Sequence, residues 1–236
     1  MLFRITPEAL DASQGRWPAA SHDSTQPSRR RPQSIRVFHN GWIEKWLSKA
    51  HPIAPLVWFG PLVAYGLYVG ATSARLTALG SVGLFLAGWL VWSFMEYLLH
   101  RFVFHMRADT PKKKLQMFMA HGYHHEFPND KMRLVAPPLM SWSIGLPFFA
   151  IYYIVLGPDY WAIFTAGNVV GYMAYDWIHY YTHHFRPKRG LGKWLRTYHL
   201  LHHHQSPNAR YGVSSPLWDI IFGTYRPISD RLPRKK

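Results

Sequence analysis

Long apolar stretches dominate the middle of the chain. Four of them, each close to the roughly 20 residues that a helix needs to cross a bilayer, cover residues 53–70, 76–99, 138–157 and 160–178. A helix of a soluble protein normally keeps a polar face, and these stretches do not, so a soluble all-helical core is the weaker interpretation. The connections between the first and second stretches and between the third and fourth are short, which predicts two transmembrane helical hairpins.

The positions of the basic residues orient these hairpins. Of the 27 lysines and arginines, all but Arg75 lie in residues 1–52, 100–137 and 179–236. Because basic residues accumulate on the cytosolic side of membrane proteins, both termini and the central segment are expected to be cytosolic. The predicted fold is an all-α, multi-pass integral membrane protein with four transmembrane helices in two hairpins and a cytosolic helical cap.

The N-terminal part of the chain lacks a sustained hydrophobic period. We therefore expect residues 1–40 to form a basic, disordered cytosolic tail, without a secretory signal peptide, and residues 41–236 to form one domain. Residues 42–47, WIEKWL, fit a short helix at the membrane interface.

The overall charge has two interpretations. A net charge of +15 is typical of nucleic-acid-binding proteins when the chain is soluble, but 17% aromatic residues and 11 tryptophans favour a membrane. We expect the run RRR at 29–31 to meet anionic lipid head groups, with a nucleic-acid or localisation patch as the alternative. No nucleic-acid partner is expected.

Histidines gather in four clusters that share a spacing. The clusters are HRFVFH at 100–105, HGYHH at 121–125, HYYTHH at 179–184 and HLLHH at 199–203, and together with the residue that follows the last one they hold 12 of the 15 histidines. Histidines at i, i+3 and i+4 share a helix face, so each triplet is expected to aim its rings at a common point. Since the second apolar stretch runs directly into His100 and the fourth into His179, all four clusters should lie on the cytosolic side of the membrane.

The clusters predict metal chemistry. The chain has no cysteine, and imidazole suits iron, zinc, copper and nickel. Ten histidines at these spacings exceed the three or four ligands of one zinc ion, so two metal ions are expected. Activation of dioxygen against an alkyl carbon requires a redox metal such as iron, whereas zinc could only support hydrolysis. No nucleophile or acid–base carboxylate motif accompanies the clusters to favour hydrolysis.

Residues beside the clusters carry further expectations. His184 and His204 lie about 100° around the helix from His183 and His203, so their rings should miss the metals. Glu96 and Asp176 precede histidines by four and three residues and could accept hydrogen bonds from the rings, or they could be ordinary helix-end carboxylates. Asn168 is expected to bond a neighbouring helix. Residues 211–227 are expected to form a short amphipathic segment packed over the cytosolic domain, with a lid as the alternative.

Four segments carry a resemblance to a known family: EYLLHRFVFH, HGYHHEFPNDKMRLVAPP, YDWIHYYTHH, and LRTYHLLHHH with GVSSPLWDIIFGT. Over about residues 40–227 the chain resembles the membrane fatty acid hydroxylase and sterol desaturase superfamily, and within it the fatty acid 2-hydroxylases of sphingolipid acyl chains. The resemblance implies a dimetal centre, di-iron as the expected form and zinc as an option for the isolated protein, with dioxygen as co-substrate. It places the metal ligands at His100, His105, His121, His124, His125, His179, His183, His199, His202 and His203.

The resemblance also implies partners. The reaction would be hydroxylation of a membrane lipid at the carbon next to the acyl carbonyl, with electrons from outside the site. Many members carry a fused cytochrome b5-type haem domain with a His-Pro-Gly-Gly motif, which residues 1–52 lack, so a separate cytochrome b5-type or ferredoxin-type donor is expected. A carotenoid or sterol hydroxylase or desaturase is the enzymatic alternative. A histidine-rich metal transporter or chaperone is another, which the clustering at one membrane face disfavours.

Overall fold

The computed structural model describes residues 3–16 and 32–229. Across these residues the chain is helical and contains no β-strand beyond an isolated bridge between Ile5 and Phe38. The α-helices are α1 (Pro7–Ser13), α2 (Gly41–Trp46), α3 (Ala54–Thr72), α4 (Ala78–Leu98), α5 (Pro111–Met117), α6 (Tyr123–Glu126), α7 (Pro138–Leu156), α8 (Trp161–His184), α9 (Gly190–His204) and α10 (Leu217–Ile221). Two π-helical turns, η1 (Leu99–Phe104) and η2 (Phe118–Gly122), continue α4 and α5.

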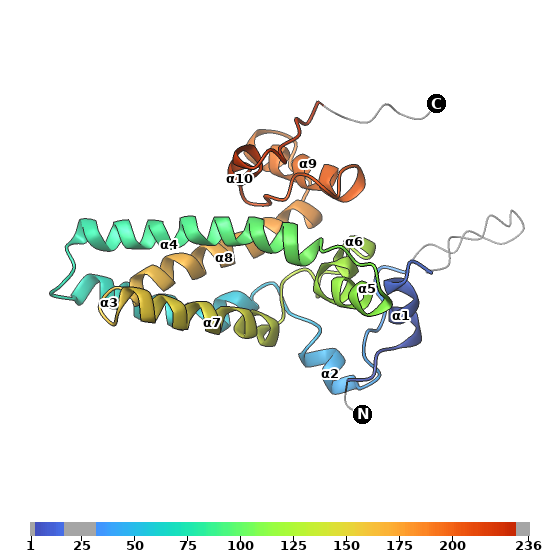
Figure 1. The fold of residues 1–236 in the computed structure, drawn as a ribbon, viewed down its shortest axis with the longest axis horizontal. Coiled ribbons are helices and arrows are strands. Elements are labelled where there is room, and N and C mark those ends of the chain that lie inside the picture. Colours follow the sequence, from blue (N-terminus) through green and yellow to red (C-terminus); the bar gives the residue numbers. More distant parts are fainter. Residues whose placement is uncertain (1–2, 17–31, 230–236) are drawn as a thin grey trace, which may run out of the picture.

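The four long helices occupy the four apolar stretches and lie side by side (Figure 1). Three stretches of the described chain are long and apolar enough to cross a membrane: Ala54–Thr72, Ala78–Phe104 and Pro138–Leu156. The remaining helix, α8, is enclosed by α3, α4 and α7, and it buries polar side chains such as Thr165 and Asn168. Its lower hydropathy therefore reflects a position inside the bundle, and four membrane crossings stay a prediction.

Small residues let α8 approach α3 and α4 closely. A side-chain carbon added at Gly167 would lie 1.9 Å from the carbonyl oxygen of Phe85, and one added at Gly88 would lie 2.0 Å from that of Phe164. Asn168 bonds the neighbouring helix as expected, because its Nδ2 donates to the Gly88 carbonyl at 3.2 Å. α8 belongs to the second predicted hairpin and packs against α3 and α4 of the first. It therefore holds the two hairpins together.

The N-terminal residues belong to the folded body. Ala9 and Ala12 of α1 are buried in one apolar cluster with Val37, Ile43 and Phe118. The expected disorder of residues 1–40 is therefore wrong for 3–16 and 32–40, because their scattered apolar side chains find partners far along the chain. Residues 17–31, which include the RRR run, lie outside the described residues.

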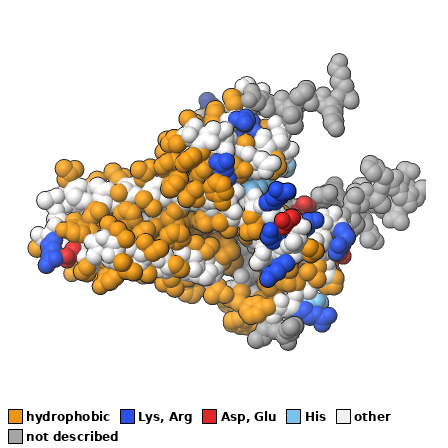
Figure 2. Space-filling model, in the orientation of Figure 1, with side chains coloured by type: hydrophobic (Ala, Val, Ile, Leu, Met, Phe, Trp, Pro, Cys, Tyr) orange, Lys and Arg blue, Asp and Glu red, His pale blue; other side chains and the backbone are white. Residues whose placement is uncertain are grey.

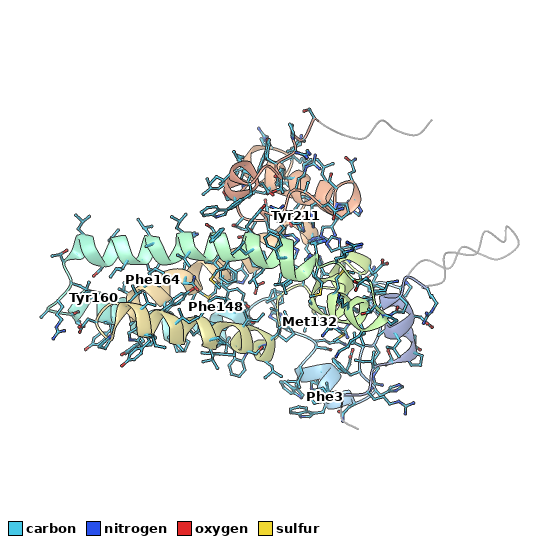
Figure 3. The ribbon with its side chains drawn as sticks, in the orientation of Figure 1. Phe3, Met132, Phe148, Tyr160, Phe164 and Tyr211 are labelled. Carbon is cyan, nitrogen blue, oxygen red and sulfur yellow. The ribbon has the colours of Figure 1, made fainter. Side chains whose placement is uncertain are left out.

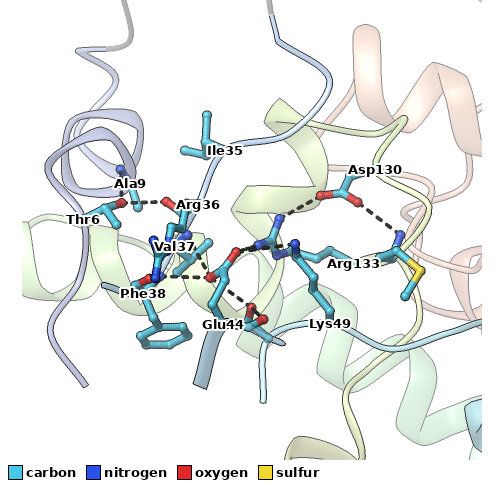
Figure 4. Close-up of polar contacts among 12 residues, drawn as sticks. Thr6, Ala9, Ile35, Arg36, Val37, Phe38, Glu44, Lys49, Asp130 and Arg133 are labelled. Atoms are coloured by element: carbon cyan, nitrogen blue, oxygen red, sulfur yellow. Dashed lines mark hydrogen bonds and ion pairs between the residues drawn. The ribbon is translucent and has the colours of Figure 1, made fainter. Parts of the chain in front are cut away.

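A buried ionic cluster ties this N-terminal body to the segment that follows α6 (Figure 4). The Glu44 carboxylate accepts hydrogen bonds from the backbone amides of Val37 and Phe38 at 3.1 and 3.0 Å and pairs with Arg133. Arg133, whose side chain is 5% exposed, also pairs with Asp130 at 2.8 Å. These contacts hold residues 130–135 in place at the entrance to α7.

Candidate metal centre

A π-helical turn brings the first two predicted ligands together. His100 and His105 are five residues apart, and in an α-helix their side chains would point about 140° away from each other. In η1 the amide of His105 donates to the carbonyl of His100 at 3.1 Å, the i+5 bond of a π-helix. Their ring centroids lie 5.0 Å apart as a result.

A second π-helical turn overlaps the start of the HGYHH cluster. The amide of Tyr123 bonds the carbonyl of Phe118, which closes η2. The His121 and His125 rings lie on the same side of this segment, with centroids 4.7 Å apart. Both π-turns therefore occur where histidines must converge, a common association in functional sites.

The ten predicted ligands gather in two groups of five. The nitrogen atoms they offer lie within 4.8 Å of one another inside each group. The first group consists of His100, His105, His121, His125 and His202. The second group consists of His124, His179, His183, His199 and His203.

The expectation that each triplet aims at one point is wrong. His124 belongs to the second group and its neighbour His125 to the first, and His202 and His203 divide in the same way. Successive side chains on a helix diverge by about 100°, so one helix turn supplies both groups. The His125 and His203 rings stack with centroids 4.0 Å apart and form a wall between the groups.

Among the described residues, the histidines outside the ten join neither group. His204 is exposed, and the His184 ring packs against Tyr180 with centroids 4.4 Å apart. This placement agrees with the register argument made for both residues.

The spacing between ring nitrogens fits metal coordination. In the second group, Nε2 of His199 lies 2.8 Å from that of His183 and 3.0 Å from that of His203, and Nε2 of His124 lies 2.9 Å from that of His179. Two nitrogens bound at about 2.1 Å from one metal would be about 3.0 Å apart at a right angle and about 3.4 Å apart in a tetrahedron. The distances match the right angle, the arrangement of five or six ligands.

Unpartnered buried nitrogens support the same assignment. Nε2 of His100, His121 and His125 is buried without a hydrogen-bond partner. Buried polar atoms almost always have a partner, and three such atoms in one group are explained by a metal ion bound between them. The residues present therefore fit two metal ions.

Burial also keeps the rings in the metal-binding form. Desolvation, reinforced by neighbouring histidines, lowers the pKa of His125 to about 2 and that of His105 to about 3. Desolvation alone dominates at His202, whose pKa falls to about 4. Neutral imidazole is the form that ligates metals, so these rings are ready to bind without losing a proton first.

Backbone carbonyls, not the predicted carboxylates, orient two rings of the first group. Nδ1 of His100 lies 2.5 Å from the carbonyl oxygen of Tyr211, and Nδ1 of His202 lies 2.7 Å from that of Ala209. With Nδ1 donating, Nε2 remains free for the metal. The sequence does not predict these two contacts, because every residue has a backbone carbonyl and no residue type marks the ones that face a histidine.

Glu96 and Asp176 have other partners. Glu96 accepts hydrogen bonds from the amides of Val213 and Ser214 at 2.7 and 2.9 Å. Asp176 lies close to the Tyr172 hydroxyl and the Ala136 amide, and its Oδ2 is buried without a hydrogen-bond partner. Within the described residues neither carboxylate has a hydrogen bond to a histidine ring, so of the two alternatives left open by the sequence the geometry does not favour direct orientation of the rings.

A third carboxylate, Asp219, holds the loop that carries the two carbonyls. It is fully buried and accepts from the amides of Tyr211 and Gly212 at 2.9 and 2.8 Å, and from the hydroxyls of Thr224 and Tyr198. We call residues 209–224, held by Asp219 and Glu96, the C-terminal clasp. An aspartate inside the apolar run PLWDII was the available sequence signal for this role.

An apolar cavity of about 600 Å³ adjoins the histidines. Its lining includes residues of α4, α7 and α8 and extends from Phe148 to His121, His124 and His179. Phe148 lies in the middle of α7 (Figure 3). Both histidine groups therefore contribute to the end of the cavity. Polar atoms on the wall include the Ser141 and Tyr172 hydroxyls, which are 2.8 Å apart.

Comparison with known proteins agrees with this geometry. The model of the Fatty acid hydroxylase family matches residues 85–224. A dihydroceramide fatty acyl 2-hydroxylase of Arabidopsis thaliana is 34% identical over 186 residues, which cover 77% of this chain and 75% of that protein. A ceramide very long chain fatty acid hydroxylase of Saccharomyces cerevisiae is 36% identical over 81% of this chain and 50% of its own length.

A solved structure has a similar fold. The structure of full-length scs7p, in which only the hydroxylase domain is visible, superposes with a TM-score of 0.73 at 34% identity and covers 82% of this chain and 73% of that one. The residues that the family model matches, 85–224, include both histidine groups, most of α4, all of α7 and α8, and the clasp. This integral membrane protein belongs to the fatty acid hydroxylase family.

Proposed function

We propose that the protein is an oxygen-dependent lipid 2-hydroxylase that uses two iron ions, one held by each histidine group. The relatives named above are fatty acyl and ceramide fatty acid hydroxylases, and this chain shares at least a third of its residues with them over most of its length. The ten histidines would be the ligands, five to each ion.

The cavity is the observation that carries this proposal. It is apolar, it has the volume of a typical ligand pocket, and it ends on rings from both histidine groups. An acyl chain lying between α4, α7 and α8 would present the carbons nearest its polar end to the metal ions. The Ser141 and Tyr172 hydroxyls could donate to the acyl carbonyl and so place the adjacent carbon for reaction.

The reaction defines what the protein must supply. A C–H bond is replaced by C–OH, one atom of dioxygen enters the lipid, and the other leaves as water after two electrons and two protons arrive. When bound, the iron pair supplies the binding and reduction of dioxygen. The apolar wall of the cavity would exclude water and hold the acyl chain. The buried neutral imidazole rings would hold the metal ions.

The proposed topology has four crossings, with both termini and the histidine-bearing cap in the cytosol. In this arrangement electrons come from a soluble or membrane-bound donor protein of the cytochrome b5 or ferredoxin type. The abundance of basic residues in the cap segments supports that orientation.

Lipid mass spectrometry tests the proposal. The full chain is expressed in cells that contain no 2-hydroxylated lipids, in parallel with the His124→Ala variant as a matched control. We expect new acyl lipids heavier by one oxygen atom, with the hydroxyl at the 2-position by fragmentation and the oxygen derived from isotopically labelled dioxygen. Oxygen derived from water, or product formed equally by the variant, would rule out the proposed reaction.

A further inference from the structure

The short helix α10 buries its carboxylate and exposes its large apolar side chains, which is the reverse of a helix on a water-facing surface. Its one carboxylate, Asp219, is fully buried, whereas Leu217, Ile220, Ile221 and the following Phe222 are 41%, 60%, 56% and 46% exposed. An exposed cluster of four large apolar side chains marks an interaction surface.

The depth of α10 relative to a bilayer follows from its contacts with α4. The indole Nε1 of Trp218 donates to the Ser93 hydroxyl at 3.0 Å, and the Phe222 ring stacks on Tyr97 with centroids 5.3 Å apart. Phe94 packs against the Trp218 ring at 4.7 Å. α10 therefore lies beside residues 93–97 of α4.

These residues must lie inside the hydrocarbon if α4 crosses the bilayer. The apolar stretch Ala78–Phe104 has 27 residues, and the hydrocarbon covers about 20 of them. Every window of about 20 residues within this stretch contains residues 85–97. Whatever the exact depth of α4, the helix beside Ser93 and Tyr97 is within the membrane.

The surface of the molecule supports the same position. Figure 2 shows hydrophobic side chains on the long helices and on the adjoining C-terminal part of the chain. Arg226, exposed four residues beyond Phe222, would reach back to the lipid head groups.

We propose that Leu217, Ile220, Ile221 and Phe222 form a membrane foot that is embedded in the leaflet on the histidine side, with lipid acyl chains as its partner. The inference rests on α4 crossing the bilayer, as in the proposed topology, and not on the reaction. Because the foot and the Tyr211 carbonyl belong to the same clasp, the bilayer would also support the orientation of His100.

The absence of cysteine from the chain makes a direct test available. Single variants Ile220→Cys and Leu217→Cys are labelled with an environment-sensitive fluorophore, and the protein is reconstituted in phosphatidylcholine vesicles. Quenching is then measured with a lipid that carries a nitroxide on its acyl chain and with iodide in the water. Leu90→Cys on the exposed face of α4 is the lipid control, and Lys193→Cys on α9 is the water control.

We expect both foot positions to behave like position 90, with several-fold stronger quenching by the nitroxide lipid than at position 193 and little quenching by iodide. Strong iodide quenching at both positions would show that the foot is in water and overturn the proposal. Protection from both quenchers, with disulfide cross-linking of Ile220→Cys between chains, would assign the surface to a second copy and overturn it equally. If iodide quenched the label at position 90 itself, α4 would not cross the bilayer as proposed, and the premise of the inference would be wrong.

Discussion

Neighbouring histidines in this chain belong to different histidine groups. His124 and His203 contribute to one group while His125 and His202 contribute to the other, because adjacent side chains on a helix point about 100° apart. The His125 and His203 rings stack between the groups, so each group forms part of the wall of the other. A single ring is therefore expected to influence both sites.

Variants of adjacent histidines separate ligands from bystanders. We expect His183→Ala and His203→Ala to abolish activity and to lower the metal content from about two ions per chain towards one. His184→Ala and His204→Ala should keep most of the metal and most of the rate, because neither ring reaches a group. Elemental analysis of purified protein measures this difference. An essential His204 beside a dispensable His203 would mean that the helix register is shifted by one residue after Leu200.

Asp219 acts on the first histidine group indirectly, because it holds the loop whose Tyr211 carbonyl contacts His100. In Asp219→Asn one acceptor oxygen becomes an amide donor that faces either the Tyr211 amide or the Gly212 amide, and the carboxylate loses its charge, so hydrogen bonds typically worth about 1.5–3 kcal/mol each are lost or weakened. The Tyr211 carbonyl is then released from His100, and we expect preferential loss of one metal ion. Metal titration measures this, with Asp159→Asn as the control because Asp159 pairs with Arg75 far from the histidines. Equal loss of both ions would contradict a role confined to the first group.

At the scale of elements, departures from the regular α-helix position the ligands. Each of η1 and η2 interrupts an α-helix just before or within a histidine cluster and changes the direction of every side chain that follows. Glycines on α4 and α8 allow these two helices to pack closely. This contact brings α8, which carries His179 and His183, against α4, which leads into His100. The metal centre thus depends on the packing of the membrane helices.

A bulky residue at the α4–α8 contact tests this dependence. Gly167→Leu would drive a side chain into the Phe85 carbonyl, and overpacking of this kind costs typically about 1–3 kcal/mol or more. We expect a lower melting temperature in detergent and loss of bound metal. Gly83→Leu is the matched control, because nothing lies within 4 Å of the added carbon and the position is exposed. If both variants melted alike, the close contact would have no special role.

Across the whole molecule, polar and charged groups are concentrated at the two ends of the bundle. The histidine groups, α5, α6 and the Glu44–Arg133 cluster lie at one end, and an Arg75–Asp159 ion pair joins the two short connections at the other (Figures 1 and 2). The exposed apolar side chains of α3, α4 and α7 lie between these ends. This separation is the arrangement of a protein that crosses a bilayer.

Reporter fusions test the direction of that crossing. Fusions at Arg75 and Asp159 should read as non-cytosolic and a fusion at Lys113 as cytosolic, since basic residues avoid translocation. Alkaline phosphatase and a fluorescent protein give opposite signals on the two sides of the membrane and serve as mutual controls. An external Lys113 would reverse the proposed orientation and remove the cytosolic route for electrons.

Sequence alone determined the features that depend on neighbours along the chain. Hydrophobic runs located α3, α4, α7 and α8, and the ten histidines that the family resemblance implied as ligands are the ten that gather in two groups in the structure. Local periodicity contains this information because a helix repeats every few residues.

Tertiary structure alone decided how those pieces combine. The π-turn at His105, the division of each triplet between two groups and the carbonyl of Tyr211 on His100, 111 residues away, involve partners or backbone bonds that no residue pattern encodes. The ordering of α1 followed the same rule, since Ala9 and Ala12 acquire their apolar surroundings from Phe118 and Tyr123. Contacts between distant residues form only when the bundle closes, and they set which side chains each histidine group contains and where the apolar cavity lies.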